Sequence, residues 1–360
     1  MKEKYCKIPK FRFNKFLESW ERLKYEDVIE VNSGKDYKHL DKGDIPVYGT
    51  GGYMLSVSEA ITDKDGVGIG RKGTINKPYI LKAPYWTVDT LFFCIPKNKY
   101  NLYFINAIFE RAQWERFDES TGVPSLSKLT INNIQNYFPS FNEQSAIGSL
   151  FRTLDDLLAS YKDNLANYQS LKATMLSKMF PKAGQTVPEI RLEGFDGEWE
   201  RKSLSEVCTI NSGRDYKHLK DGDIPVYGTG GYMLSVNEKL SDEDAIGIGR
   251  KGTIDKPYLL SGPFWTVDTL FYVTCKVGYD LNYLFLVFQK VRWKKFDEST
   301  GVPSLSKKTI EKVVSKFPSL PEQQAIGSYF SNLDNLINSH QEKISQLETL
   351  KKKLLQDMFI

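Results

Sequence analysis

The sequence Tyr48-Gly49-Thr50-Gly51-Gly52-Tyr53-Met54-Leu55-Ser56-Val57 occurs twice, because the same residues return at positions 227–236. The shift of about 179 positions holds without slippage from Pro9 and Pro188 to Phe180 and Phe359. Solenoid repeats have periods of roughly 20–50 residues, whereas each copy here has the size of a domain, about 100–200 residues. The chain is therefore predicted to be a covalent pseudo-dimer, made of copy 1 (9–180) and copy 2 (188–359).

The composition is that of an ordinary globular protein, with 41% hydrophobic and 26% charged residues. The net charge of +4 is compatible with a nucleic-acid partner but does not require one. No apolar run approaches the roughly 18 residues of a membrane span, and residues 1–6 lack a signal-peptide stretch, so we expect a cytoplasmic protein with no membrane partner. The cysteines do not repeat between the copies, which predicts scattered reduced thiols and no disulfide frame or metal site: Cys6, Cys94, Cys208 and Cys275.

The texture of each copy changes along its length. Residues 23–138 and 202–317 are dense in glycine, proline, threonine and tyrosine with short apolar runs, which predicts irregular, strand-rich globules. Within them, 102–116 and 281–295 are predicted to be helical. The predicted class is α+β, with globular domains at 1–139 and 182–318 and long helices at 140–181 and 319–360.

Each long helix is predicted from apolar residues that alternate at steps of four and three, the a/d pattern of a coiled coil. Ser140 and Ser319 stand three residues before Glu143 and Glu322, which is capping-box spacing. A helix that packs only on its own globular half is the alternative, but so long and narrow a seam favours the twin helix as partner. We therefore predict two antiparallel helices of about 55–60 Å that separate the globular domains with pseudo-two-fold symmetry. The seam is Ile147, Phe151, Leu154, Leu158, Tyr161, Leu165, Tyr168, Met175 and Met179 in copy 1, and Ile326, Phe330, Leu333, Ile337, His340, Ile344, Leu347, Leu354 and Met358 in copy 2, with Lys172 and Lys351 at the omitted position.

The motifs that suggest catalysis are weak. Residues 68–73 fit G-x-G-x-x-G, but Pro78 would stop a helix soon afterwards, so a glycine-rich loop with exposed cations is favoured over a dinucleotide site. Residues 76–79 resemble the Asn-Pro-Pro-Tyr motif of amino-methyltransferases, except that Lys77 replaces a proline. Asp118 and Glu119 lie among turn-forming residues and are predicted to satisfy backbone N–H groups. We predict no catalytic residue and no metal ligand in this chain.

Each copy does carry cations and neutral donors on loops that contain glycine. Glycine lets the backbone approach a phosphate closely, and arginine or lysine supplies charge or a bidentate contact with guanine. A solvated charged loop is the alternative for any single one of these residues. The predicted DNA-binding residues are Lys35, Tyr37, Lys38, His39, Tyr53, Arg71, Lys72, Lys77 and Thr121 in copy 1, and Arg214, Tyr216, Lys217, His218, Tyr232, Arg250, Lys251, Lys256 and Thr300 in copy 2.

The order of these motifs resembles the specificity subunit of type I restriction–modification systems over essentially the whole chain. The resemblance implies a non-catalytic subunit with two target recognition domains that read double-stranded DNA, held apart by two antiparallel helices. It implies two modification subunits that methylate adenine with S-adenosylmethionine, and restriction subunits that use ATP with Mg²⁺. In copy 1 the resemblance is carried by Trp-Glu-Arg at 20–22, Gly-Asp-Ile-Pro-Val-Tyr-Gly-Thr-Gly-Gly at 43–52, Gly-Arg-Lys-Gly-Thr at 70–74, Ser-Thr-Gly-Val-Pro-Ser-Leu-Ser at 120–127 and Glu-Gln-x-Ala-Ile-Gly at 143–148.

The likeness of the two copies predicts the form of the DNA target. Members of this family commonly carry two unlike recognition domains, whereas about half of the aligned residues are identical here. Two like domains related by a two-fold rotation read the same word on opposite strands, so we predict a bipartite site that is an interrupted palindrome. Differences between half-sites are expected at Ser58–Gly66 against Asn237–Ala245, Asn76 against Asp255, and Asn98–Arg116 against Val277–Lys295.

Two other functions stay open at this point. A stand-alone transcription regulator would bind a palindrome tightly as a covalent dimer, whereas a specificity subunit would bind poorly without its modification partners. An enzyme with buried nuclease or methyltransferase activity would show that activity in the purified chain.

Overall fold

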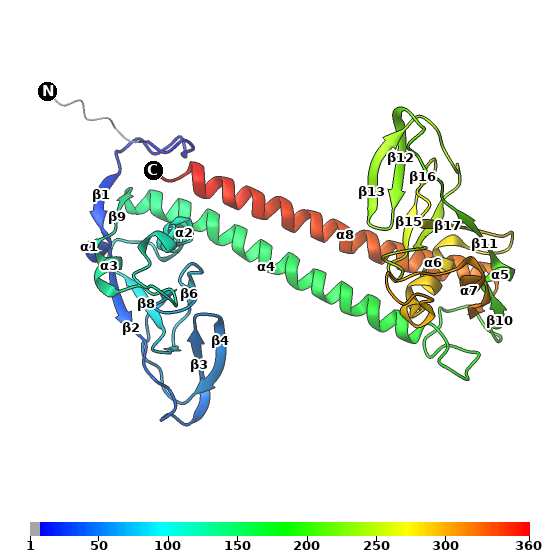
Figure 1. Ribbon diagram of the computed structural model, residues 1–360. Helices are drawn as coiled ribbons and strands as arrows, with labels where there is room; N and C mark the ends of the chain where they lie inside the picture. The colour runs from blue at the N-terminus through cyan, green and yellow to red at the C-terminus, as the bar shows by residue number, and fades with distance from the viewer. Residues whose placement is uncertain (1–7) are drawn as a thin grey trace. The chain divides into compact units, whose positions relative to one another are not determined.

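The computed structural model describes residues 8–360, which fall into two compact units. Unit 1 comprises Met1–Asp163 and Gln341–Ile360, and unit 2 comprises Asn164–His340. Both long helices therefore begin in one unit and end in the other, so that each unit holds one globular domain and a segment of each helix (Figure 1). Cys6 lies outside the described residues.

The globular part of unit 1 contains three small sheets. The four-stranded sheet has the order β2-β8-β5-β6 and is antiparallel throughout, whereas the three-stranded sheet β4-β3-β7 pairs β7 parallel to β3. The first strand pairs with the last, which joins the two ends of the domain. The elements are β1 (Glu21–Lys24), α1 (Tyr25–Val28), β2 (Ile29–Ser33), β3 (Lys42–Gly49), β4 (Gly52–Val57), β5 (Gly66–Gly70), β6 (Tyr79–Leu81), β7 (Trp86–Thr87), β8 (Leu91–Pro96), α2 (Leu102–Arg111), the 3-10 helix η1 (Trp114–Phe117), α3 (Lys128–Asn133) and β9 (Gln135–Phe138).

Unit 2 repeats this topology strand for strand. Its sheets have the orders β11-β17-β14-β15 and β13-β12-β16, and its first and last strands pair in the same way. The predicted α+β class with two similar strand-rich domains is confirmed. The elements are β10 (Glu200–Ser203), α5 (Leu204–Val207), β11 (Cys208–Ser212), β12 (Asp221–Gly228), β13 (Gly231–Val236), β14 (Ala245–Gly249), β15 (Tyr258–Leu260), β16 (Trp265–Thr266), β17 (Leu270–Cys275), α6 (Leu281–Lys290), the 3-10 helix η2 (Trp293–Phe296), α7 (Lys307–Lys312) and β18 (Val314–Phe317).

The two long helices are α4 (Phe141–Lys178) and α8 (Leu320–Asp357), drawn in green and orange-red in Figure 1. Within unit 1, ion pairs join Asp155 to Lys351 and Lys162 to Glu348. Later residues of α4 therefore meet earlier residues of α8, as in an antiparallel pair. Within unit 2, the Tyr168 ring packs against His340 with centroids 5.1 Å apart, and Lys172 pairs with Asp334, so later residues of α4 again meet earlier residues of α8. The helix segments are therefore antiparallel inside each unit, as the seam predicts.

Each globular core includes apolar residues from both helices. In unit 1 the start of α4 contributes Ile147 and Phe151, and the residues after α8 contribute Phe359, whose ring lies 5.5 Å from that of Phe104. In unit 2 Phe180 stacks on Tyr283 at 5.4 Å in the same way. The alternative of a helix that packs only on its own globular half is wrong, because each helix end enters the core of the other copy's domain.

The predicted capping boxes have a different partner in the structure. The Glu143 carboxylate is buried and accepts hydrogen bonds from Nε and Nη2 of Arg12, both at 2.7 Å. Glu322 accepts from Arg191 at 2.8 and 2.7 Å. These glutamates are therefore committed to the lead-in segments, which they tie to the helix starts.

The description of the cysteines as scattered needs correction for one pair. Cys208 on β11 and Cys275 on β17 are direct partners in an antiparallel strand pair, although they lie far apart in sequence. Both thiols are free, as is that of Cys94. In unit 1 the equivalent partners are Ile29 and Pro96, so this juxtaposition belongs to unit 2 alone.

Among the described residues, no helix has the length and apolar character needed to cross a membrane.

Candidate nucleic-acid interface

One short segment, residues 87–90, holds the predicted DNA-binding loops of unit 1 together. The Lys35 N–H donates to the Thr87 carbonyl at 2.9 Å, and the Arg71 N–H donates to the Thr90 carbonyl at 2.8 Å. The Val88 N–H donates to the Tyr48 carbonyl in the β3–β4 hairpin at 3.0 Å. Three loops that are distant in sequence are thereby fixed to one backbone segment.

The loop after β2 lies unusually close to this segment. A Cβ atom on Gly34 would stand 2.0 Å from the Val88 carbonyl oxygen, so only glycine fits there. The indole N–H of Trp86 donates to the Lys35 carbonyl at 2.9 Å, and the His39 ring packs edge-on against the same indole at 5.9 Å. With its backbone held in this way, the loop exposes the side chains of Lys35, Lys38 and His39 and half-buries Tyr37; Arg214, Lys217, His218 and Tyr216 do the same in unit 2.

The loop after β5 carries the second pair of cations. The Arg71 guanidinium lies over the Phe92 ring at 5.8 Å and donates to the Asp89 carbonyl at 3.4 Å. The Gly73 N–H donates to the Pro124 carbonyl at 2.8 Å, which brings the loop that carries Thr121 alongside. Residues 68–70 belong to the buried strand β5 and not to a loop, whereas Arg71 and Lys72 are exposed. The favoured interpretation of this motif is therefore confirmed for the exposed cations and corrected for the first half of the supposed loop.

The acids beside these cations shape a loop. Oδ1 of Asp118 accepts from the N–H groups of Ser125 at 2.9 Å and Ser120 at 3.0 Å, and these bonds hold the pKa of Asp118 below its usual range. Hydroxyl groups of Thr130 and Ser127 lower the pKa of Glu119 similarly. The interpretation of Asp118 as a backbone-satisfying residue is confirmed.

In unit 2 the equivalent loops border a cavity of about 450 Å³, here called the basic groove. Sequence reasoning named Arg250 and Lys251 but missed Lys307 and Ser212. The signal that could have found them is repetition, since every residue that lines the groove has an identical counterpart in unit 1. The groove is lined by Ser212, Arg250, Lys251, Phe271, Glu298, Ser304, Leu305, Ser306 and Lys307, and the counterparts are Ser33, Arg71, Lys72, Phe92, Glu119, Ser125, Leu126, Ser127 and Lys128.

The remaining predicted residues do not line this groove. Tyr232 is 64% exposed on the β12–β13 hairpin, and Tyr53 is 63% exposed on the β3–β4 hairpin. Thr121 and Thr300 are exposed in the loops that follow Asp118 and Asp297. Lys77 and Lys256 are also exposed, in a segment whose preceding residue contacts η1 or η2, and Lys256 does not line the groove.

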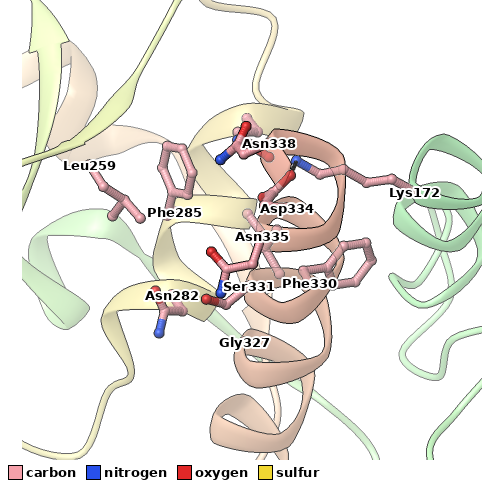
Figure 2. A pocket seen from close by; sticks show the side chains of 12 residues that line it. Lys172, Leu259, Asn282, Phe285, Gly327, Phe330, Ser331, Asp334, Asn335 and Asn338 are labelled. Carbon is pink, nitrogen blue, oxygen red and sulfur yellow. Dashed lines mark hydrogen bonds and ion pairs between the residues drawn. The ribbon is translucent and has the colours of Figure 1, made fainter. Parts of the chain in front are cut away.

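Another hollow lies between α6 and α8 in unit 2 and has a volume of about 330 Å³. Figure 2 shows Lys172 extending toward Asp334 on α8, and its Nζ lies 2.5 Å from Oδ1 of Asp334. Its other lining residues are mainly asparagine, leucine and phenylalanine, which favours a role in helix packing. Across residues 8–360, no group of three histidine, cysteine or acidic side chains is placed to hold a metal ion.

The chain belongs to the family of type I restriction modification DNA specificity domains, whose model matches it twice, over residues 17–167 and 196–349. A curated relative, the type I restriction enzyme MjaVIII specificity subunit of Methanocaldococcus jannaschii, is 22% identical over 277 residues. That match covers 66% of this chain and 64% of the relative. The crystal structure of a type I restriction–modification S subunit from M. genitalium shares the fold, with a TM-score of 0.78 at 17% identity over 98% of this chain and 99% of that one.

Proposed function

We propose that this chain is the DNA specificity subunit of a type I restriction–modification complex. Its two grooves read the two halves of a bipartite site, and its helices carry two modification subunits that methylate adenine, with restriction subunits added to them. S-adenosylmethionine and ATP with Mg²⁺ are then bound by those partners, so this chain contributes recognition and no catalytic group. The chain acts in the cytoplasm, where it meets DNA.

The observation that carries the proposal is the basic groove of unit 2, whose lining residues all have identical counterparts in unit 1. Arg250, Lys251 and Lys307 provide charge for phosphate oxygens or bidentate contacts with guanine, and serine hydroxyls provide neutral donors. Because the lining residues are the same in both units, the two half-sites share bases, and the target is an interrupted palindrome. The other DNA-binding residues predicted from the sequence, from Lys35 to Thr300, are proposed as further contacts on the neighbouring loops.

The experiment that tests this proposal is mapping of methylated adenine across the genome in cells that carry the chain with its modification subunit, against cells that lack the chain. We expect one new motif, an interrupted palindrome, to be methylated. A motif with unrelated halves would preserve the function but contradict the shared reading by the two grooves. Absence of new methylation with an active partner would contradict the function, and tight specific binding by the isolated chain would then indicate a transcription regulator.

A further inference from the structure

The two units differ in charge at several places near the basic groove and its counterpart residues, and one of these places is a 3-10 helix. The 3-10 helix η1 of unit 1 reads Trp-Glu-Arg-Phe after Gln113, whereas η2 of unit 2 reads Trp-Lys-Lys-Phe after Arg292. The charged residues are exposed in both helices. The tryptophan is buried and keeps its bond to the preceding helix, at 2.7 Å from Trp114 to the Phe109 carbonyl and 2.8 Å from Trp293 to Phe288. The fold is therefore conserved while the outer charge changes.

A second divergent position meets this helix in space. In unit 1 the Asn76 amide donates to the Glu115 carboxylate at 2.7 Å. In unit 2 Asp255 replaces the asparagine and Lys294 replaces the glutamate, and their charged groups lie 2.7 Å apart. The same contact is kept, but the acid has moved from the helix to the loop, and a cation now stands on the helix.

These contacts place η2 next to the basic groove. Asp255 follows Gly252 on the loop that begins with Arg250 and Lys251, and η2 runs directly into Glu298, which lines the groove. The exchange gives unit 2 a net gain of about two positive charges at this edge, because Arg292 and Lys294 add three relative to unit 1 and Asp255 removes one. Phosphate contacts by lysine and arginine set the affinity and salt dependence of DNA binding, while base contacts set its specificity.

We propose that Arg292, which precedes η2, and Lys294 and Lys295 within it form a phosphate-binding edge with three cations where unit 1 has only Arg116, so that unit 2 is the DNA anchor of this subunit. The inference rests on the proposed function and adds to it an asymmetry between the two recognition domains. Both units read similar bases through their grooves, whereas unit 2 holds the backbone of its half-site more strongly. Binding through unit 2 is therefore stronger at low salt than binding through unit 1, and it falls more steeply as the salt concentration rises.

The test is an exchange of the natural residues between the units, measured in the complex with modification subunits. The variant Arg292→Gln/Lys294→Glu/Asp255→Asn gives unit 2 the pair found in unit 1, and Gln113→Arg/Glu115→Lys/Asn76→Asp does the reverse. The affinity of the complex is measured from 50 to 200 mM salt for two unmethylated duplexes. One contains the motif that the complex methylates, and the other has a scrambled sequence. Lys15→Glu, at an exposed site in the lead-in segment of unit 1, makes the same net charge change as the first variant and serves as the control.

For the first variant we expect the slope of log affinity against log salt to become shallower by about 1.8, since each phosphate contact contributes about 0.9. The loss of affinity between 50 and 200 mM salt is then about tenfold smaller for the variant than for the wild type. The reverse exchange is expected to steepen the slope. The preference for the motif over the scrambled duplex is expected to stay the same in both variants, because phosphate contacts carry no base information.

An unchanged slope in the first variant, with wild-type preference for the motif, overturns the anchor and leaves the proposed function standing. A slope change of equal size in Lys15→Glu also overturns it, because the effect would then be one of net charge. A wild-type complex without preference for the motif contradicts the proposed function itself.

Discussion

Gly34 and Gly213 fix the position of the first basic loop in each unit. A Cβ on Gly213 would lie 2.0 Å from the Val267 carbonyl oxygen, and Gly34 is equally confined by Val88. We expect Gly34→Ala to lower the free energy of unfolding by about 1–3 kcal/mol, the usual cost of overpacking, and to weaken DNA binding because Lys35 is displaced. Gly51→Ala is the control, since a Cβ there meets nothing within 4 Å. Urea unfolding curves that coincide for the two variants would contradict this account.

Cys208 and Cys275 illustrate how burial controls the chemistry of a single residue. Burial raises the pKa of each thiol to about 12, and Lys276 lowers that of Cys208 only in part. The reactive species is the thiolate, so alkylation of both thiols in the native chain should be slow near pH 8 and should rise about tenfold per pH unit through pH 10. Mass spectrometry of iodoacetamide-treated chain measures this, with the urea-unfolded chain as control. A native rate that levels off near pH 9 would show that the thiols are not held in their neutral form.

For single residues, the sequence predicted the exposed cations of the loops but not the residues that lie beside them in space. The glycine-flanked positions Arg71 and Lys72 were found because their loop chemistry is local. Lys307 and Ser212 were missed because the contacts that bring them to the groove are long-range strand pairings. The pairing of Cys208 with Cys275 was missed for the same reason, since it depends on the register of β11 against β17.

Among the helices, the lysines that interrupt the predicted seam act as paired charges. Lys351 lies 2.5 Å from Asp155 and 2.6 Å from Glu110. Burial alone would lower the pKa of Lys351, but the two carboxylates outweigh it and raise the pKa. Lys351→Met leaves both acids without a counter-ion, so we expect a loss of about 1–3 kcal/mol in unfolding free energy, between the values for exposed and fully buried pairs. Lys343→Met, at an exposed position, should change stability little in the same urea titration.

Removal of the charge of Glu110 is expected to stabilise the fold, in contrast to removal of the charge of Lys351. Burial raises its pKa above the usual range, and Lys351 offsets only part of that effect. A carboxyl group whose pKa is higher in the folded state contributes its stability below the unfolded pKa and loses it as pH rises through the folded pKa. Glu110→Gln should therefore gain stability relative to wild type between pH 4 and pH 7, and unit 2 already has Gln289 at this position. A relative stability that falls over this pH range would contradict the argument.

The helices also show where local sequence signals stop being sufficient. The steps of four and three predicted the seam, and Ile147, Phe151, Leu154 and Leu158 are buried as expected. The capping-box spacing predicted a local partner for Glu143, but the guanidinium of Arg12, which is distant in sequence, takes its carboxylate. Two hydrogen bonds from a charged guanidinium stabilise the carboxylate more than one bond from a neutral backbone N–H, so the tertiary partner is preferred.

For the whole molecule, the repeat without slippage makes the recognition domains exchangeable. Residues 23–138 and 202–317 have the same length, and their supports in the helices, Ile147 and Phe151 against Ile326 and Phe330, are identical. A chimera that carries the segment 202–317 in both places has glutamine instead of Glu110 as the neighbour of Lys351. Unit 2 already has this arrangement, because Gln289 and Lys172 line the same hollow. We therefore expect the chimera to fold and to direct methylation to a perfect interrupted palindrome built from the half-site of unit 2, with the native spacer length because α4 and α8 are unchanged. Mapping of methylated adenine in cells with the chimera and its modification subunit measures this, and the reverse chimera should yield the palindrome of the other half-site. A folded chimera that methylates a motif with a different spacer would show that the recognition domains, and not the helices alone, set the distance between the half-sites.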